Sequence, residues 1–334
     1  MAGFFDKSST VAKPGFNRWM VPPAALCIHL CIGQVYAFSV FKIPLTQIVG
    51  VTESAPADWS QSTLAWIFSL AIAALGLSAA FGGRWLERVG PRKAMTLSAA
   101  CFGGGFIVSA FGVWWHQIWL VYLGYGVIGG IGLGIGYISP VSTLIKWFPD
   151  RPGLATGMAI MGFGGGAMIG APLKDWLIKT FYSAPDYLGP ITQVELITQA
   201  GRRFAQVAGE LREITVIGAN DVANMIIPGP EGIYLVNTGT VGVAQAFVAL
   251  GIIYFFVMIA AAFSYRLPAP GWRPEGWVPP DKEERAKRMI SSHDVDIDQA
   301  LKTPQFYQLW IVLCFNVTAG IGVLSVARTM MTEI

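Results

Sequence analysis

The chain has 334 residues, of which 54% are hydrophobic and only 13% are charged, and its mean hydropathy is +0.53. Soluble domains carry about 25% charged residues, so this composition argues against most soluble enzymes, nucleic-acid-binding proteins and disordered scaffolds. The net charge of +3 is small and indicates no particular partner.

Seven apolar stretches divide the chain. Each has roughly 20 or more residues without Asp, Glu, Lys or Arg, which is long enough to cross a bilayer core about 30 Å thick. We therefore predict an all-α membrane protein that is embedded in the lipid bilayer. The predicted helices cover residues 19–41, 60–81, 94–114, 119–146, 153–173, 238–265 and 305–327.

Lys and Arg residues alternate between the two sides of the predicted membrane. The N-terminal tail has three, the 2–3 connection four, the 4–5 connection two and the linker after the sixth helix seven. The 1–2 connection has only Lys42, and the 3–4 connection has none. Because short positive loops stay in the cytoplasm, we predict a multi-pass protein of the plasma (inner) membrane with a cytoplasmic N-terminus.

The spacing of these helices predicts three regions. They are an N-terminal six-helix bundle (1–265) with an extracytoplasmic insertion at about 178–235, a cytoplasmic linker (266–303), and the first transmembrane helix of an incomplete second bundle (304–334). We expect a truncated chain for this reason. Within the insertion, residues 192–217 have helical spacing, and the charged run from Asp281 to Arg288 predicts an amphipathic helix.

The predicted spans contain no charged side chain away from their ends. This predicts a neutral first half without the acidic group that proton-coupled carriers use as a relay. Gln34 and Tyr36 in the first helix are either part of a pocket wall or interhelical hydrogen-bonding groups, and His29 fits the second role. Further aromatic candidates for the pocket are Trp66, Tyr122, Tyr125 and Tyr137.

Glycines recur along the fourth and fifth predicted helices. Rows of small residues let two helix backbones approach closely, either as static packing or as a contact that can slide. The helix-packing candidates in the fifth helix are Gly157, Gly162, Gly166 and Gly170, followed by Pro172, which predicts a kink.

The loop between the second and third helices reads Gly83-Arg84-Trp85-Leu86-Glu87-Arg88-Val89-Gly90-Pro91-Arg92-Lys93. It resembles the loop signature of the major facilitator superfamily, although Glu87 replaces the usual Asp and Pro91 takes a place often held by Arg. Glycines at Gly83 and Gly90 suit a tight turn. The carboxylate can meet a helix N-terminus or an Arg, and Arg88, Arg92 and Lys93 can form pairs that close one face of a carrier. The alternative is a positively charged anchor without a gating role.

Other segments resemble the oxalate/formate antiporter family within that superfamily. They run from Gly136 to Gly157, from Met161 to Gly166, from Tyr36 to Phe41 and from Thr303 to Trp310. The stretch from Gly166 to Pro172 is similar to a glycine-proline motif associated with antiporters. The resemblance implies a twelve-helix carrier of two rocking bundles, with Gln34 and Tyr36 lining the pocket and the anion met by an Arg and a Lys of the missing C-terminal bundle.

Three functions stay open at this point. The first is a secondary active transporter that exchanges small organic anions, such as oxalate and formate, by alternating access, or a monocarboxylate uptake carrier. The second is a non-transporting fragment or assembly module. The third is a seven-helix receptor or photoreceptor, which the predicted cytoplasmic N-terminus and the lack of a Lys in 305–327 oppose. The sequence predicts no enzyme, metal, cofactor or nucleic-acid partner.

Overall fold

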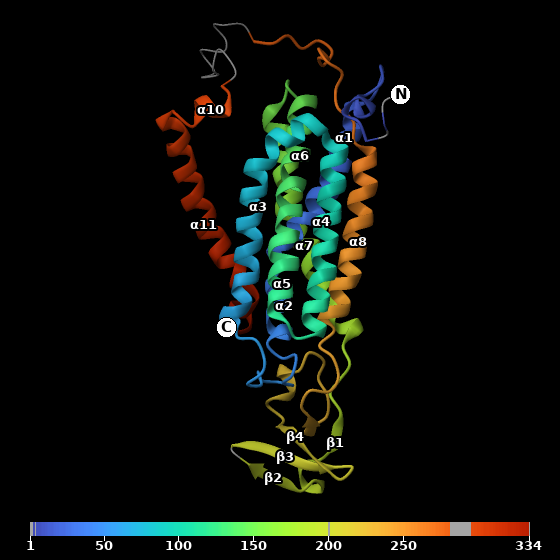
Figure 1. Cartoon of the computed structure of the whole chain (residues 1–334), viewed down its shortest axis with the longest axis vertical. Helices are drawn as coiled ribbons and strands as arrows, with labels where there is room; N and C mark the ends of the chain where they lie inside the picture. The colour runs from blue at the N-terminus through green and yellow to red at the C-terminus, as the bar shows by residue number, and fades with distance from the viewer. Residues whose placement is uncertain (1–2, 4, 200, 281–294, 334) are drawn as a thin grey trace.

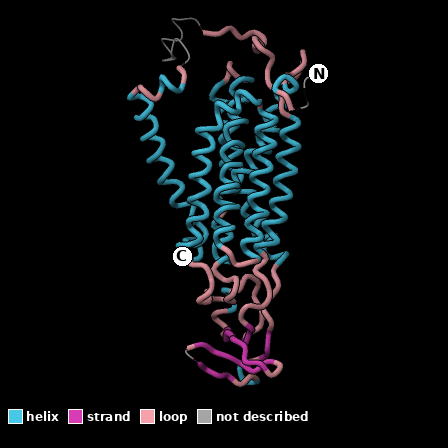
Figure 2. The backbone as a smooth tube through the Cα atoms, in the orientation of Figure 1, coloured by secondary structure: helices cyan, strands magenta, loops and turns pink. Residues whose placement is uncertain are grey.

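The structure is a computed structural model that describes residues 3, 5–199, 201–280 and 295–333. A bundle of long helices carries a small β-sheet at one end (Figures 1 and 2). Within the described residues, the helices long and apolar enough to cross a membrane cover Arg18–Ala37, Gln61–Val89, Pro91–Trp114, Ile118–Trp147, Pro152–Phe181, Val243–Ser264 and Pro304–Val323. The prediction of an all-α membrane fold is thereby confirmed for the membrane part. The run from Asp281 to Arg288 lies outside the described residues.

Five of the spans are single helices: α3 (Gln61–Val89), α4 (Pro91–Trp114), α7 (Pro152–Phe181), α8 (Val243–Ser264) and α11 (Pro304–Glu333). The first span is divided into η2 (Arg18–Met20), α1 (Val21–Gly33) and η3 (Gln34–Ala37), and the short helix α2 (Ser39–Leu45) follows it. The fourth is divided into α5 (Ile118–Val121), the π-helix η4 (Tyr122–Gly129) and α6 (Gly130–Trp147). The short helices outside the spans include η1 (Lys7–Thr10) and α10 (Ile297–Ala300).

Local signals set the ends of α3 and α4. The Ser60 hydroxyl accepts a hydrogen bond of 3.2 Å from the backbone N–H of Thr63, which caps the start of α3. Gly90 has a φ of +85°, a conformation that glycine adopts without strain, and it ends α3. Pro91 then begins α4, where its missing N–H costs no helical hydrogen bond. The loop motif is therefore a sharp turn between two helices.

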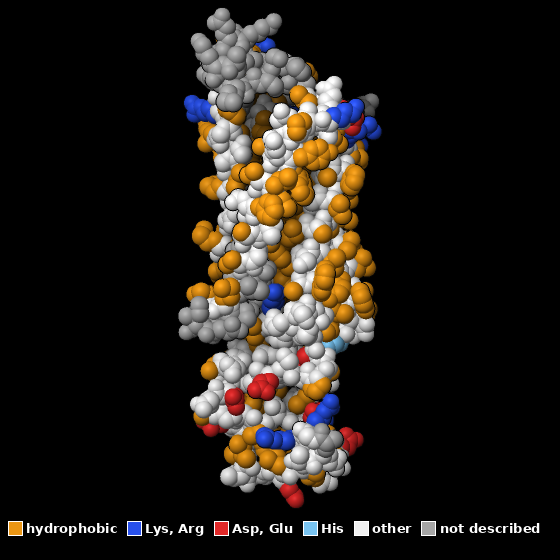
Figure 3. All heavy atoms as spheres, turned by 90° about the vertical axis from the view of Figure 1, so that its left-hand side faces the viewer, with side chains coloured by type: hydrophobic (Ala, Val, Ile, Leu, Met, Phe, Trp, Pro, Cys, Tyr) orange, Lys and Arg blue, Asp and Glu red, His pale blue; other side chains and the backbone are white. Residues whose placement is uncertain are grey.

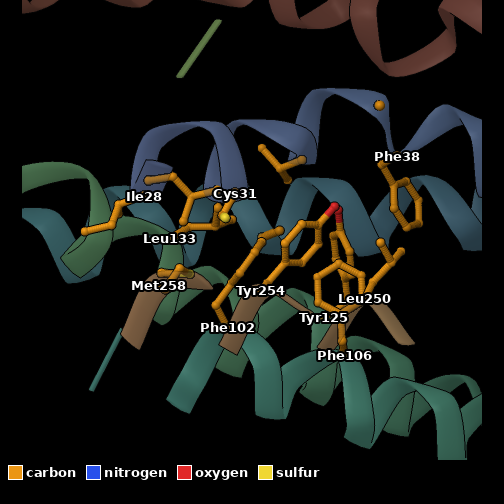
Figure 4. Close-up of a cluster of buried hydrophobic side chains, with 14 of the residues drawn as sticks. Ile28, Cys31, Phe38, Phe102, Phe106, Tyr125, Leu133, Leu250, Tyr254 and Met258 are labelled. Atoms are coloured by element: carbon orange, nitrogen blue, oxygen red, sulfur yellow. The ribbon is translucent and has the colours of Figure 1, made fainter. Parts of the chain in front are cut away.

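The core of the bundle is aromatic. Helix α1 packs against α7, α8 and α6, and α4 packs along α8 and α6. Between them, Phe102 and Phe106 of α4 contact Tyr254 of α8, and Phe38 lies 4.9 Å from Tyr125 between ring centroids (Figure 4). Because these rings come from four different spans, they hold the bundle together as one unit.

Helix α11 stands apart from this bundle. Its upper end leans away, and its lower end contacts α2 and η3 (Figure 1). Its apolar stretch Pro304–Val323 is long enough to span the membrane, and none of the residues in this stretch is buried. An apolar groove of about 560 Å³ lies between α11 and α3, lined by residues such as Phe68, Ile72, Trp310 and Leu313.

The residues between α7 and α8 form a cap over one end of the bundle, built on a five-stranded antiparallel sheet in the order β1-β5-β4-β3-β2. The strands are β1 (Tyr187–Gly189), β2 (Leu196–Gln199), β3 (Arg202–Val207), β4 (Glu210–Ile217) and β5 (Gly232–Leu235). We call residues 182–241 the cap. The helix predicted for 192–217 is wrong, because these residues form β2, β3 and β4.

The turn between β3 and β4 explains this difference. Ala208 and Gly209 both have positive φ values, +52° and +87°, which suit a two-residue hairpin turn. Ala205 and Ile214 then face a small apolar cluster with Ile233 and Leu235. The apolar residues of this segment also occur at helical intervals, so the periodicity alone misled the prediction.

The cap is fastened to the loop that follows α2. The Asn237 N–H donates to the Val49 carbonyl at 3.0 Å, and Val51 packs with Ile217 and Tyr234 of the cap. The Asp58 carboxylate fixes the loop by accepting from the backbone N–H groups of Val49, Gly50 and Ala55, each at 2.8 Å. These contacts hold the cap over the ends of α2 and α7.

The opposite end of the bundle, which we call the linker end, gathers the N-terminal tail and the start of the linker. The Ala12 N–H donates to the Leu267 carbonyl, and the Leu267 N–H donates to the Thr10 carbonyl, both at 2.8 Å. Trp272 of the linker packs edge-on against Trp147 at 4.7 Å between ring centroids. On the face that Figure 3 shows, most charged side chains lie at the two ends, and the helical middle is largely apolar.

Candidate functional site

An aromatic cluster joins three spans on the side of the bundle. The Tyr36 ring of η3 and the Tyr137 ring of α6 both lie edge-on to Phe163 of α7, at 5.2 and 4.9 Å between centroids. All three side chains are half-buried. We call these three residues the aromatic wall. Of its members, the sequence indicated Tyr36 and Tyr137 but missed Phe163, the one aromatic residue within the glycine run of the fifth span.

His29 lies behind the aromatic wall and is fully buried. Its Nε2 atom lies 3.2 Å from the Tyr137 carbonyl oxygen, and its ring packs 5.6 Å from the Tyr137 ring. His29 therefore joins the first and fourth spans, which is the interhelical role that the sequence predicted.

The other aromatic candidates occupy separate places. Tyr122 donates from its hydroxyl to the Thr63 carbonyl at 2.8 Å, near the cap end of the bundle. Tyr125 is buried in the aromatic core, where it packs against Phe106. Trp66 is 63% exposed on α3. These three side chains do not join Tyr36 and Tyr137 in one wall.

Gln34 precedes the wall by two residues but points into the bundle. Its side chain is buried, and neither amide atom has a hydrogen-bond partner. Its backbone carbonyl accepts a hydrogen bond from Lys174 of α7 at 2.8 Å. Gln34 is therefore a buried neighbour of the wall, in contact with the fifth span.

The prediction of a first half without internal charge is wrong. Helix α7 continues to Phe181, eight residues beyond the predicted end, and Lys174 lies within it, fully buried. Lys42 lies in α2 and is only 2% exposed. The sequence places both lysines in connections because the charge-free stretches end just before them. A helix does not stop at its first charged residue when the surrounding helices continue.

The glycines of α7 fall into two groups. An added Cβ on Gly162 would lie 2.8 Å from the His29 Cβ, and one on Gly170 would lie 2.7 Å from the Gln34 Cβ. Gly166 faces the backbone of α1 at Gly33. Gly157 has open space around it, and Pro172 is exposed within α7. The close approach of α1 and α7 therefore involves Gly162, Gly166 and Gly170.

The loop motif carries a set of ion pairs at the linker end. Lys146 at the end of α6 donates to both carboxylate oxygens of Glu87, at 2.7 and 2.9 Å, and Ser142 adds a bond of 3.1 Å. Glu87 thus meets a lysine of the fourth span instead of an Arg or a helix N-terminus. Arg84 reaches Asp298 of α10 at 2.8 Å, which ties the motif to the linker.

The remaining basic residues of the motif face the N-terminal tail or the surroundings. Arg92 is buried and donates to the Ser9 hydroxyl at 3.3 Å, and Lys93 lies 3.6 Å from the Asp6 carboxylate. Arg88 is exposed. Gly83 has open space around it, within α3. The motif therefore joins α3 to α6, to the tail and to the linker.

Another ion pair, this one mostly buried, lies at the linker end. Arg18 donates to both oxygens of Asp150, at 2.7 and 2.9 Å, and both side chains are mostly buried. These hydrogen bonds from Arg18 lower the pKa of Asp150 below its usual value. The pair fastens the start of the first span to the turn between α6 and α7.

This pair predicts a pH-dependent contribution to stability. Because the folded-state pKa of Asp150 is lowered, the stabilisation is present above the unfolded-state pKa of about 4 and is lost as the pH falls through the folded value. Asp150→Asn should lower the free energy of unfolding by about 1–3 kcal/mol at pH 7, with a difference that shrinks below about pH 4. Thermal unfolding in detergent across this range checks it.

The exposed pair of Arg84 with Asp298 supplies the control. Both side chains are more than half exposed, so Asp298→Asn should change stability by less than about 1 kcal/mol. An Asp150→Asn variant that unfolds at the wild-type temperature at pH 7 would contradict the prediction.

Among the described residues, no group of three or more His, Cys, Asp or Glu side chains could hold a metal ion. The site is thus described by aromatic rings, a buried amide and ammonium, and ion pairs at one end. In a bundle of membrane-spanning helices, these features define a multi-pass membrane protein with polar groups inside the bundle.

Comparison with known sequences then places the chain. Residues 24–188 match the Major Facilitator Superfamily, and the chain belongs to this superfamily. The oxalate:formate antiporter of Oxalobacter formigenes is 24% identical over 323 residues, which cover 94% of this chain and 55% of that protein. Apicoplast pyruvate carrier 1 of Toxoplasma gondii is 32% identical over 215 residues, covering 53% and 38%.

An uncharacterized transporter of the same superfamily, YhjX of Escherichia coli, is 30% identical over 152 residues, or 46% of this chain and 35% of that protein. The aligned parts thus span between about a third and about half of these relatives. The match to the superfamily covers the loop motif and the wall residues Tyr36, Tyr137 and Phe163.

Proposed function

We propose that this chain forms the first bundle of a secondary active transporter for small organic anions, which works by alternating access. The observation that carries the proposal is the alignment with the oxalate:formate antiporter along 94% of the chain. The pyruvate carrier of Toxoplasma gondii supports the same substrate class, because pyruvate is also a small carboxylate. In this proposal, α11 is the first helix of a second bundle, and the central site lies between the two.

The aromatic wall is the proposed substrate-facing surface of the first bundle. Tyr36 and Tyr137 bring hydroxyl groups to a half-buried surface, where they can donate hydrogen bonds to a carboxylate. Phe163 holds both rings in place from α7. Polar groups on an otherwise apolar wall orient a small ligand without binding it too tightly to release.

The linker end is the proposed cytoplasmic gate. It carries the N-terminal tail, the 2–3 and 4–5 turns and the linker, which hold most of the Lys and Arg residues outside the cap. The proposed location is the plasma (inner) membrane with the N-terminus in the cytoplasm. A reporter fused to the N-terminus tests this orientation, and an extracytoplasmic signal would contradict it.

Two modes of transport remain as candidates. Exchange of one anion for another follows from the similarity to the oxalate:formate antiporter, whereas uptake of a monocarboxylate follows from the similarity to the pyruvate carrier. Exchange requires an anion on the opposite side of the membrane, and uptake does not. Whether transport requires an anion on the opposite side of the membrane therefore distinguishes exchange from uptake.

The test is a counterflow assay in proteoliposomes. They contain the protein produced from the whole native reading frame to which this chain belongs. Vesicles loaded with unlabelled oxalate, formate, lactate or pyruvate are diluted into the labelled anion. We expect accumulation of at least one of these carboxylates, and none of glucose or a labelled cation. Transport limited to sugars or cations would contradict the proposal.

A further inference from the structure

Lys174 is a charged side chain in an unusual position. It lies in α7 with none of its surface exposed, and its ammonium group donates to the Gln34 carbonyl at 2.8 Å. The same nitrogen lies 5.0 Å from the centroid of the Phe41 ring. Among the described residues it makes no ion pair and no other hydrogen bond. An ammonium group has three donors, so two of them have no acceptor.

The side chain of Gln34, whose carbonyl accepts from Lys174, and two tyrosine hydroxyls of the adjoining core are also without hydrogen-bond partners. Gly170, one turn earlier in α7, packs against the Cβ of Gln34, and both atoms of the Gln34 amide are buried and unbonded. The Tyr125 hydroxyl lies beside this amide without a well-formed hydrogen bond. Figure 4 shows the hydroxyls of Tyr125 and Tyr254 turned toward one another in the same core, and both lack a partner.

This cluster holds a positive charge, and among the described residues no carboxylate is paired with it. A buried ammonium without a counter-ion is costly, and the face of the Phe41 ring offsets only part of that cost. The Gln34 amide and the two hydroxyls add N–H and O–H donors that no described carboxylate satisfies. One carboxylate group would satisfy the ammonium and the amide together, because each of its oxygens accepts two hydrogen bonds.

The cluster is also connected to the proposed pathway. Gln34 and Tyr36 both belong to η3, so one short segment carries the buried amide and the first ring of the aromatic wall. Phe163 of the wall and Lys174 both belong to α7. Gly162, Gly166 and Gly170 let α7 lie close to α1 and η3 without interlocking side chains, so a shift between these helices requires little repacking.

We infer that Lys174 and Gln34 form a carboxylate-binding site of the first bundle, entered past Tyr36 and Phe163 when α1 and α7 shift. The inference rests on the proposed function and deepens it, since it locates one positive charge for the substrate in the first bundle. A single ammonium matches one carboxylate group, so the site selects monocarboxylates, or one end of a dicarboxylate, over the corresponding amides.

Lys174→Met tests the charge, and Lys179→Met is its matched control. Lys179 lies five residues further along α7, is half exposed, and is paired with Asp175 at 2.7 Å. Counterflow is measured with labelled oxalate against unlabelled oxamide, and with labelled lactate against lactamide. Lys174→Met should raise the half-saturating carboxylate concentration about tenfold or more and reduce the preference for carboxylate over amide. Lys179→Met should stay within about twofold of the wild type.

The outcomes separate this inference from the proposed function. If the wild type carries a carboxylate and Lys174→Met carries it equally well, with the same preference over the amide, the site is wrong and the transporter proposal stands. If the wild type carries none of oxalate, formate, lactate and pyruvate, both proposals fail. If Lys174→Met does not fold, Gln34→Leu decides: a half-saturating concentration raised about fivefold supports the site, and an unchanged one overturns it.

Discussion

Replacing Gly166 with alanine is expected to destabilise the bundle by about 2 kcal/mol or more, although the change adds only one methyl group. The new Cβ would lie 2.6 Å from the Gly33 carbonyl carbon, 2.6 Å from the Leu30 oxygen and 2.7 Å from the Gln34 nitrogen. All three atoms are backbone atoms of the first span, so they cannot turn aside as a side chain could. Either α1 and α7 move apart, or the helices distort.

Gly164 provides a control of opposite sign. It lies in the same helix, two residues away, and an added Cβ there would meet nothing within 4 Å. Gly164→Ala should stabilise the chain by up to about 1 kcal/mol, because alanine forms helices better than glycine. Thermal unfolding in detergent compares the two variants. A Gly166→Ala protein as stable as Gly164→Ala would show that the two helices are not in the close contact described.

The number and order of the spans could be predicted from hydropathy, because crossing a bilayer demands long apolar helices. Their ends could not. Hydropathy predicts an end of the fifth span before Lys174 because a charged residue usually marks the membrane surface, yet α7 buries Lys174 against Gln34. Whether a lysine is buried depends on what the neighbouring spans offer it, and hydropathy contains no such information.

The cap shows a different limit. Gly209 marks the turn between β3 and β4, and a two-residue turn between short apolar runs is a hairpin signal that was available in the sequence. The spacing also predicts a helix because the same apolar residues fit both periods. A turn residue is then better evidence than periodicity, since it restricts the backbone directly.

The contacts of the candidate site could be predicted only in part. The sequence offers Tyr36 as a pocket candidate, but its partner Phe163 lies four spans later in the chain. Glu87 was recognised by its motif, but its partner Lys146 is 59 residues away. Loop motifs and residue types identify which side chains are suited to a role, whereas pairing depends on how the helices pack.

The pair of Glu87 and Lys146 leads to the second large effect. Glu87→Lys alone places two ammonium groups where one ion pair now lies, and Lys146→Glu alone places two carboxylates there. Like charges this close destabilise the arrangement that holds α3 to α6 at the proposed gate. We expect each single variant to lower the counterflow rate by about five- to tenfold, which corresponds to roughly 1–1.4 kcal/mol in the gate equilibrium.

The double variant Glu87→Lys with Lys146→Glu restores an ion pair with reversed polarity and has the same net charge as the wild type. We expect it to recover at least half of the wild-type rate, because an ion pair again joins α3 to α6. Recovery stays incomplete because Ser142 loses the Glu87 carboxylate to which it donates. A positively charged anchor would behave differently. In that case Glu87→Lys, which adds positive charge on this side, would be harmless, and the double variant, whose net charge equals that of the wild type, would match the wild type. That pattern would show that charge alone matters at this turn, and that the pair does not act as a gate.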